Sequence, residues 1–133
     1  MSQENVETVR GFMALFAADP DGALKLVSAD ATLDWSRSEA PDRGVHVGHD
    51  AWRSWMSERA EDLKDARFEV TELIDVPPDR VVVVAYMRGT GRASGVDIEG
   101  LGGGVVTLHD NRLARITLYQ TRGDALKAVG LDE

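Results

Sequence analysis

The spacing of apolar residues changes near Ala66, and this change constrains the fold more than any other feature of the sequence. Before it, apolar residues recur every three or four positions, as on one face of a helix; after it, they alternate with polar residues, as in half-buried strands. Consecutive strands joined by tight turns form antiparallel sheets, whereas parallel strands need long crossover connections. The sequence therefore predicts an α+β protein in which helices are followed by a curved antiparallel sheet.

Helical spacing occurs in three stretches of the first half of the chain. Asp19 and Pro20 separate the first two, because Asp is a favoured capping residue and Pro suits the first helical position. We therefore expect a helix that ends before Asp19, a helix from Pro20 to near Asp30, a strand over residues 31–36, a loop over 37–48, and a helix from about His49 to Leu63.

The second half contains turn residues between alternating segments. We expect a strand from Ala66 to a turn at 77–79, strands over 81–88 and 96–108, a turn at 109–111, a strand over 113–119, and a short terminal helix closed by Gly130.

The segment Gly89–Gly95 reads G-x-G-x-x-x-G, which is close to a dinucleotide-binding fingerprint. Such a site needs its glycines between a strand and a helix, because the pyrophosphate lies at the helix N-terminus. Here strands are expected on both sides, and the sequence has no Gly-Lys-Ser/Thr of a P-loop. We therefore expect a hairpin connection in which glycines adopt positive φ, and no nucleotide cofactor.

A second glycine cluster, Gly102–Gly104, lies inside an expected strand. Glycine within a strand marks a bulge, a sharp bend or the close approach of a ligand. Three in succession leave a patch of the sheet without side chains. Sheet curvature and a pocket floor are both compatible with this pattern.

Charge and composition narrow the range of partners. The formal net charge is −8 and the Lys and Arg residues are scattered, which argues against binding to nucleic acid or to an anionic membrane. The chain has no cysteine, so thiol catalysis and thiolate metal sites are excluded. The polar start is unlike a signal peptide, and no apolar run reaches the roughly 18 residues of a membrane span. We expect one cytoplasmic domain over residues 1–133.

The order of these segments resembles the SnoaL-like group of the nuclear-transport-factor-2-like superfamily, which includes ketosteroid isomerase-like and polyketide cyclase-like proteins. The stretches that carry the likeness are ENVETVRGFMALFAADPDGALKLVSADATLDWS, RGVHVGHDAW, DRVVVVAYMRGTGR and VVTLHDNRLARITLYQTRGDAL. The resemblance implies a cone: a strongly curved antiparallel sheet wrapped around three N-terminal helices, with an apolar interior pocket at one end. It also implies frequent dimerisation through the outer face of the sheet.

The known catalytic residues of that superfamily are mostly missing. By the resemblance, the oxyanion-binding Tyr of steroid isomerases corresponds to Phe12, their general base to Trp35, and their second acid falls within Gly102–Gly104. The Arg-x-Asp pair of limonene-epoxide hydrolases falls on residues 85–87, and their further Asp near Leu118.

Three titratable residues are weak candidates for acid–base chemistry: Asp34, His46 and His49. Asp34 lies one position before Trp35, and an offset of one residue in a strand turns the side chain to the opposite face. It therefore reaches a pocket only if a bulge turns it inward; otherwise it lies on the outer face. His46 and His49 flank a turn at the expected pocket end, and no third metal ligand is evident, so no metal site is expected.

Several apolar residues are expected either to wall a ligand pocket or to form ordinary core, and the sequence leaves both open. They are Phe12, Phe16, Trp35, Trp55, Met56, Met87, Gly102 and Gly104. Tyr86 and Arg88 alternate with Met87, so we expect them on the outer face, in a homodimer interface.

Two functions stay open. The first is a SnoaL-like protein that binds a hydrophobic cyclic molecule and acts on it as an isomerase, cyclase or hydrolase by acid–base chemistry. It requires Asp34, His46 or His49 inside the pocket with a shifted pKa. The second is a non-catalytic ligand-binding or dimerisation module of the same fold, with a pocket of apolar side chains and glycine.

Overall fold

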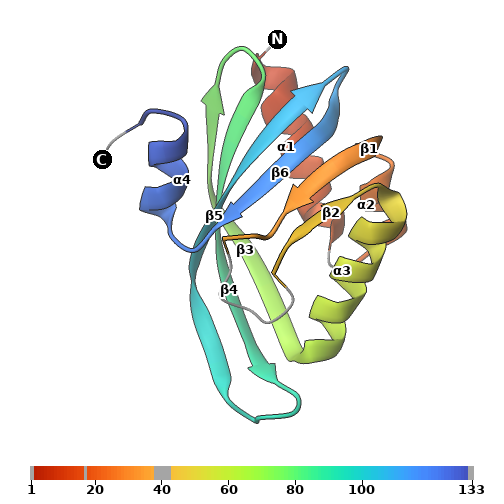
Figure 1. Ribbon diagram of the computed structural model, residues 1–133. Coiled ribbons are helices and arrows are strands. Elements are labelled where there is room, and N and C mark those ends of the chain that lie inside the picture. Colours follow the sequence, from red (N-terminus) through yellow and green to blue (C-terminus); the bar gives the residue numbers. More distant parts are fainter. Residues whose placement is uncertain (1, 17, 38–42, 132–133) are drawn as a thin grey trace.

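The computed structural model describes residues 2–16, 18–37 and 43–131 and confirms the α+β class (Figure 1). Its helices are α1 (Ser2–Phe16), α2 (Pro20–Leu24), α3 (His49–Asp62) and α4 (Arg122–Ala128). Its strands are β1 (Val27–Asp34), β2 (Val45–Val47), β3 (Leu63–Val76), β4 (Arg80–Gly91), β5 (Asp97–His109) and β6 (Arg112–Tyr119).

The strands form one six-stranded sheet in the order β2-β1-β6-β5-β4-β3. All neighbours are antiparallel except β1 and β6, which pair in parallel, so the prediction of a wholly antiparallel sheet is wrong at this position. The strands β3 to β6 follow one another through short connections, which force antiparallel pairing. No hairpin joins β1 to β6, so the direction of β1 is set by tertiary packing.

Two turns confirm the expected hairpins. Asp110 and Asn111 have φ of 51° and 62° between β5 and β6, as in the two-residue turns that match the twist of a hairpin. Between β4 and β5, Gly95 has a φ of 70° and its amide donates to the Gly91 carbonyl. The glycine-rich segment is therefore a strand-to-strand connection.

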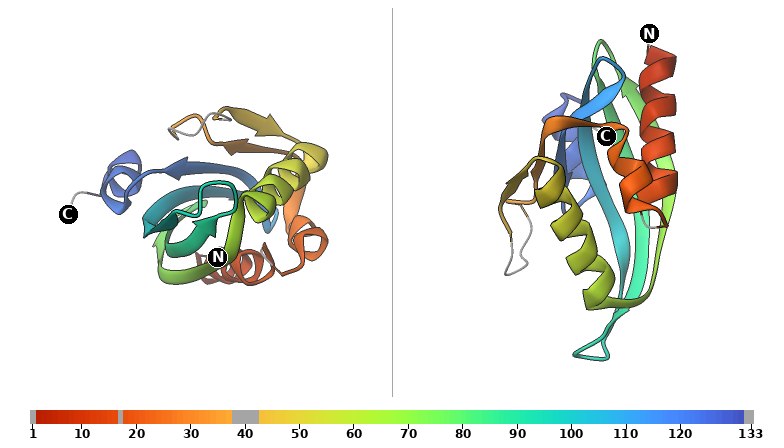
Figure 2. Two further views of the ribbon diagram at one scale, coloured as in Figure 1. Left: turned by 90° about the horizontal axis from the view of Figure 1, so that it is seen from below. Right: turned by 90° about the vertical axis from the view of Figure 1, so that its right-hand side faces the viewer.

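The sheet is curved, and its two faces are covered differently (Figure 2). The helices α1, α2 and α3 pack on the inner face, where Val81 and Val83 of β4 belong to the main core. The helix α4 packs on the outer face, where Val82 and Val84 contact its residues in a second, smaller core. Register shifts in β3, after Lys64 and after Val70, add to the curvature, because bulges bend a strand and increase its twist.

Two elements differ from the expectation. Asp19 accepts a hydrogen bond from the Gly22 amide and Pro20 starts α2, as predicted, but the helix ends at Leu24 and β1 begins at Val27. The strand β2 lies in the segment expected to be loop. Its short length and its exposed residues, Val45 and Val47, give no alternating signal that separates it from a loop.

The glycine triplet in β5 faces two ways. A Cβ atom added at Gly103 would lie 2.8 Å from the Cβ of Ala125 in α4, so this glycine allows α4 to approach the outer face. Gly102 and Gly104 pair with Ala85 and Val83 of β4 and face inward. The absence of side chains in the triplet therefore allows α4 to approach the outer face and leaves the inner face of β5 bare at Gly102 and Gly104.

Candidate functional site

A cavity of about 410 Å³ lies between the inner face of the sheet and the helices α1 and α3. Its volume falls within the range of about 300–1,000 Å³ typical of small-molecule sites. Seven aromatic residues line it, from α1, α3, β3, β6 and the position after β1: Phe12, Phe16, Trp35, Trp52, Trp55, Phe68 and Tyr119.

The β5 side of the cavity is lined by alternate glycines. Gly100, Gly102 and Gly104 face Met87, Ala85 and Val83 across the β4–β5 ladder, and all six line the cavity. A Cβ atom at Gly100 would have no neighbour within 4 Å, and at Gly102 it would meet only the Tyr119 carbonyl oxygen, at 3.8 Å. The missing side chains at Gly100 and Gly102 therefore leave open space, whereas a Cβ atom at Gly104 would meet the Leu118 side chain at 3.4 Å.

The aromatic wall is held by edge-to-face contacts. The rings of Phe16 and Phe68 are 5.0 Å apart at 80°, and those of Phe12 and Trp52 are 6.1 Å apart at 83°. The indole N–H of Trp52 donates to the carbonyl of Ala31 at 3.0 Å, which fixes this ring between α3 and β1. Such pairs stabilise by about 0.5–1.5 kcal/mol beyond the burial of their area.

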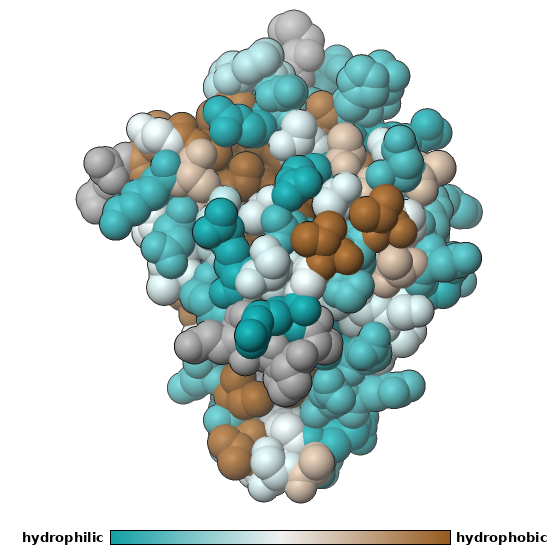
Figure 3. Space-filling view, in the orientation of Figure 1, coloured by the Kyte–Doolittle hydropathy of each residue, from teal (hydrophilic) through white to brown (hydrophobic). Residues whose placement is uncertain are grey.

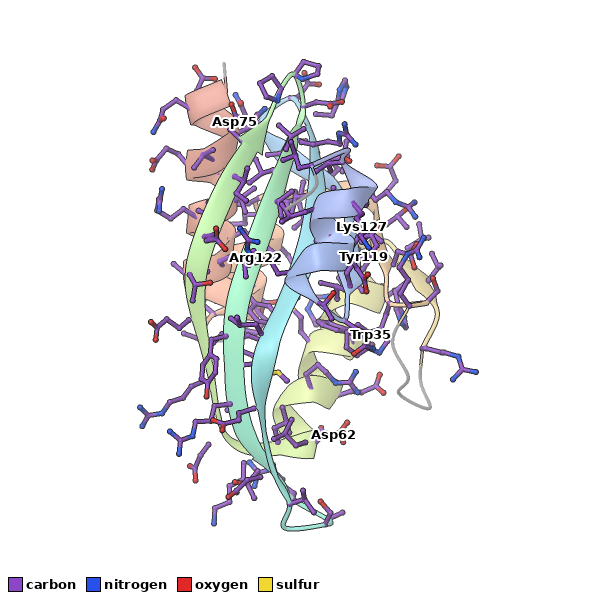
Figure 4. All side chains as sticks on the ribbon, turned by 90° about the vertical axis from the view of Figure 1, so that its left-hand side faces the viewer. Trp35, Asp62, Asp75, Tyr119, Arg122 and Lys127 are labelled. Atoms are coloured by element: carbon purple, nitrogen blue, oxygen red, sulfur yellow. The ribbon has the colours of Figure 1, made fainter. Side chains whose placement is uncertain are left out.

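Two further tryptophans meet at the α3 end of the cavity. The rings of Trp35 and Trp55 are 5.2 Å apart at 73°, and Figure 4 shows Trp35 beside α3. The guanidinium carbon of Arg59 lies 5.7 Å from the Trp35 ring and 5.5 Å from the Trp55 ring. The indole nitrogens of both tryptophans are buried and have no hydrogen-bond partner within the described part of the chain.

The eight residues expected to wall a pocket all lie on the cavity lining: Phe12, Phe16, Trp35, Trp55, Met56, Met87, Gly102 and Gly104. Their contact with a ligand stays a prediction. Sequence reasoning missed Arg59, although it continues the helical series of Trp52, Trp55 and Met56 on α3. The helical spacing of these positions indicated that Arg59 faces the same side of α3. Because charged residues on helices are usually exposed, Arg59 was not assigned to the pocket from the sequence.

Asp34 does not lie on the lining. It follows Leu33, which does, and its side chain is on the opposite face of β1, where it pairs in register with Thr117. Its carboxylate accepts hydrogen bonds from the Ser36 hydroxyl and amide and from the Arg115 guanidinium, the last at 2.8 Å. These bonds, led by that of the Ser36 hydroxyl, hold the pKa of Asp34 below its usual value, although burial acts in the opposite direction. A carboxylate held in this way is a weak base.

Neither His46 nor His49 lies on the lining. His46 is in β2 opposite Leu33, and its Nε2 atom is buried without a hydrogen-bond partner among the residues described. His49 is the first residue of α3, and its Nε2 atom lies 2.8 Å from the Val27 carbonyl oxygen. The requirement of the acid–base hypothesis, one of these three groups inside the pocket, is therefore not met by the cavity as it stands.

Charged and ionisable side chains are few on this lining. Within the described residues they are Arg59, Glu99 and Tyr119. The Glu99 carboxylate accepts a hydrogen bond from the hydroxyl of Tyr86, a residue of the outer face. This hydrogen bond raises the pKa of Tyr86. In residues 2–16, 18–37 and 43–131, no three His, Asp or Glu side chains are grouped so as to hold a metal ion. No helix in the described part of the chain is long and apolar enough to cross a membrane.

Residues 9–116 match the family model of the SnoaL-like domain. A search of curated protein sequences finds no match. Among solved structures, an NTF2-like protein from Burkholderia xenovorans LB400 is 24% identical, with 90% of each chain covered and a TM-score of 0.76.

Two other solved structures share the fold. TerC, co-crystallised with polyporic acid, is 19% identical, with 95% of this chain and 98% of TerC covered and a TM-score of 0.76. A protein from Jannaschia sp. CCS1, described as a SnoaL-like polyketide cyclase, is 18% identical, with 89% and 85% covered and a TM-score of 0.77. At these identities the likeness concerns the fold alone. The family model, in contrast, spans most of the sequence, and the chain therefore belongs to the SnoaL-like family.

Proposed function

We propose that this protein binds a hydrophobic cyclic small molecule in the cavity between α3 and the sheet. The observation that carries the proposal is the combination of an aromatic wall with a side-chain-free floor at Gly100, Gly102 and Gly104. Flat rings of a ligand can pack against glycine backbone on one side and against indole rings on the other. The TerC complex with polyporic acid supports this ligand class, because it holds a small molecule in the same fold.

The positions of the titratable groups favour binding over acid–base catalysis. Asp34 is engaged on the outer face by Ser36 and Arg115, and His49 contacts a backbone carbonyl. General acid–base chemistry needs a proton-carrying group within hydrogen-bond reach of the reacting atom. The proton-carrying groups on the described lining are Glu99, whose carboxylate bonds to the Tyr86 hydroxyl, and Tyr119.

Binding can be tested with methyl 2-naphthoate, a neutral bicyclic probe, followed by tryptophan fluorescence and calorimetry. We expect saturable binding by the wild type and at least a roughly tenfold higher Kd for Gly102→Leu, whose side chain would occupy the open space. The control is Val47→Leu on the outer face of β2, where the side chain is 59% exposed. Equal affinities for the three proteins would contradict the proposal.

A cyclase-, isomerase- or hydrolase-type reaction is the second candidate function. Arg59 favours it, because a positive charge in apolar surroundings stabilises an oxyanion that develops during a reaction. Asp34, His46 and His49 are the proton carriers to test, by Asp34→Asn, His46→Gln and His49→Gln variants. Loss of turnover of a cyclic β,γ-unsaturated ketone, with binding of methyl 2-naphthoate intact, would establish an enzyme. Equal behaviour of the three variants and the wild type would leave binding as the function.

We further propose that two copies associate through the outer face of the sheet, including Tyr86 and Arg88. In support, Leu101 lies opposite Tyr86 in the β4–β5 ladder and is 50% exposed. Light scattering of the purified protein should give the mass of two chains, and Leu101→Asp should give that of one. Val96→Asp, in the connection between β4 and β5, is the control. A wild-type mass of one chain would refute this proposal.

A further inference from the structure

Three side chains that carry hydrogen-bond donors lie together at the α3 end of the cavity. Trp35 and Trp55 each present an indole N–H, and Arg59 presents a guanidinium, which has no acceptor atom. Trp55 and Arg59 are four residues apart on α3 and so lie on the same side of the helix. The centroids of the two indole rings are 5.2 Å apart, and the guanidinium carbon of Arg59 lies 5.5 to 5.7 Å from them.

The two indole N–H groups lack acceptors in the described part of the chain, and this is unusual for buried donors. Trp55 is only 7% exposed. Trp52, in the same wall, shows the usual arrangement, because its N–H donates to the Ala31 carbonyl at 3.0 Å. Trp35 and Trp55 thus differ from Trp52 in having no acceptor from the described protein, and a ligand oxygen would supply one.

The charge at this end of the cavity is positive. The Arg59 side chain is 18% exposed and its guanidinium lies over both indole rings. It donates to Asp62 at 3.0 Å, but Asp62 is at the end of α3 and 66% exposed. The attraction between Arg59 and an anion is stronger inside the cavity than in water, because the surroundings there are apolar.

The chain as a whole is acidic. The chain has a formal net charge of −8, and the face drawn in Figure 3 is mostly hydrophilic with small, separate hydrophobic groups. On the described lining, Glu99 is the single carboxylate, and it bonds to Tyr86 of the outer face. A preference for an anionic ligand would therefore arise locally, at Arg59.

We infer that the ligand carries an anionic oxygen on an aromatic or fused-ring body, as in a carboxylate, a phenolate or an acidic enol. Arg59 and the indole N–H groups of Trp35 and Trp55 bind that oxygen, and the glycine floor and aromatic wall hold the rings. This inference rests on the proposed binding function and adds the chemical class of the ligand.

The test compares 2-naphthoate with methyl 2-naphthoate, which have the same ring system and differ in charge. We expect the wild type to bind 2-naphthoate about tenfold or more tightly than the ester, as for hydrogen bonds to a charged group. Arg59→Gln should remove this preference and bring the ratio of the two Kd values to within about twofold of one. Arg53→Gln is the matched control, because Arg53 is on the same helix but bonds to Asp21 and Asp50 at the surface.

Two single variants keep the test independent of the stability of Arg59→Gln. Trp35→Phe and Trp55→Phe retain a ring and remove the N–H, and each should weaken 2-naphthoate binding about threefold to tenfold more than it weakens binding of the ester. Equal affinity of the wild type for both compounds, or an unchanged preference in Arg59→Gln, would overturn the inference and leave the proposed function standing. Absence of binding by both compounds would overturn both.

Discussion

The inner face of β5 has two halves that differ in the size of their side chains. Val106 and Leu108, at one end, are 1% and 5% exposed and belong to the main core. Gly100, Gly102 and Gly104, at the other, line a cavity of about 410 Å³. The two halves share one strand and one face, but β6 pairs with β5 only from Gly103 onward. The comparison teaches that the cavity lies where β5 carries glycine on its inner face, largely beyond its pairing with β6.

The largest effect is expected in the closed half. Leu108→Ala removes a side chain that is 5% exposed and should lower the free energy of unfolding by about 2–5 kcal/mol, because the cavity it leaves cannot collapse fully. Urea unfolding followed by tryptophan fluorescence measures this. A loss below about 1 kcal/mol would mean that this half is as loosely filled as the glycine half, which would end the comparison.

A smaller effect is expected where the glycine triplet faces outward. In Gly103→Val the new side chain would start 2.8 Å from the Ala125 Cβ and 3.1 Å from the Thr121 carbonyl oxygen. The helix α4 must then shift, and we expect a loss of about 1–3 kcal/mol in the same unfolding measurement. No loss would show that α4 is not seated on Gly103.

Asp34 is a polar residue near the open half, and its side chain bonds to Ser36 and Arg115 on the outer face. A substitution at this position measures how much these bonds stabilise the fold. In Asp34→Asn the bonds with Ser36 and Arg115 weaken, and we expect a loss of about 1 kcal/mol at neutral pH.

The pH dependence has a definite sign. Because the pKa of Asp34 is lowered on folding, its contribution is complete above its unfolded value, near 3.8, and is lost as the pH falls through the lower folded value. The variant should therefore lose less stability than the wild type below about pH 4. Identical acid unfolding curves would contradict this assignment.

The smallest effect is expected in the open half. A Cβ atom at Gly100 would meet no atom within 4 Å, so Gly100→Ala introduces no clash. Glycine in a strand is entropically unfavourable, and we expect a gain of about 0.5 kcal/mol in the free energy of unfolding. A clear loss of stability would mean that the floor is not open at this position.

The regular parts of the fold could be predicted because their signals are local. The helix α3 and the hairpins of β3 to β6 follow from hydrophobic period and from turn residues such as Asp110 and Asn111. The strand β2 could not be predicted in this way, since it is short and its Val45 and Val47 are exposed on the outer face. The parallel pairing of β1 with β6 also has no local signal.

The candidate site also has residues that the sequence predicted and residues that it did not. The expectation of glycines opposite tryptophans came from residue type and strand alternation, and the structure places all eight expected wall residues around one cavity. Arg59 was not expected there, because a charged residue at a helical position is usually solvated. Its guanidinium lies over the ring of Trp35, which directly follows β1 and is far from Arg59 in the sequence.

By itself, the sequence determined the α+β class, the alternation that separates Asp34 from Trp35 on β1, and the absence of a nucleotide-binding helix after the glycine-rich segment. These follow from periodicity and turn chemistry, which act over a few residues. Only the tertiary structure decided that α4 would cover Gly103, that Gly102 would face open space, and that three donors would meet at one end of the cavity. The physical reason is that curvature and strand pairing bring distant segments together, and free space exists only between such segments.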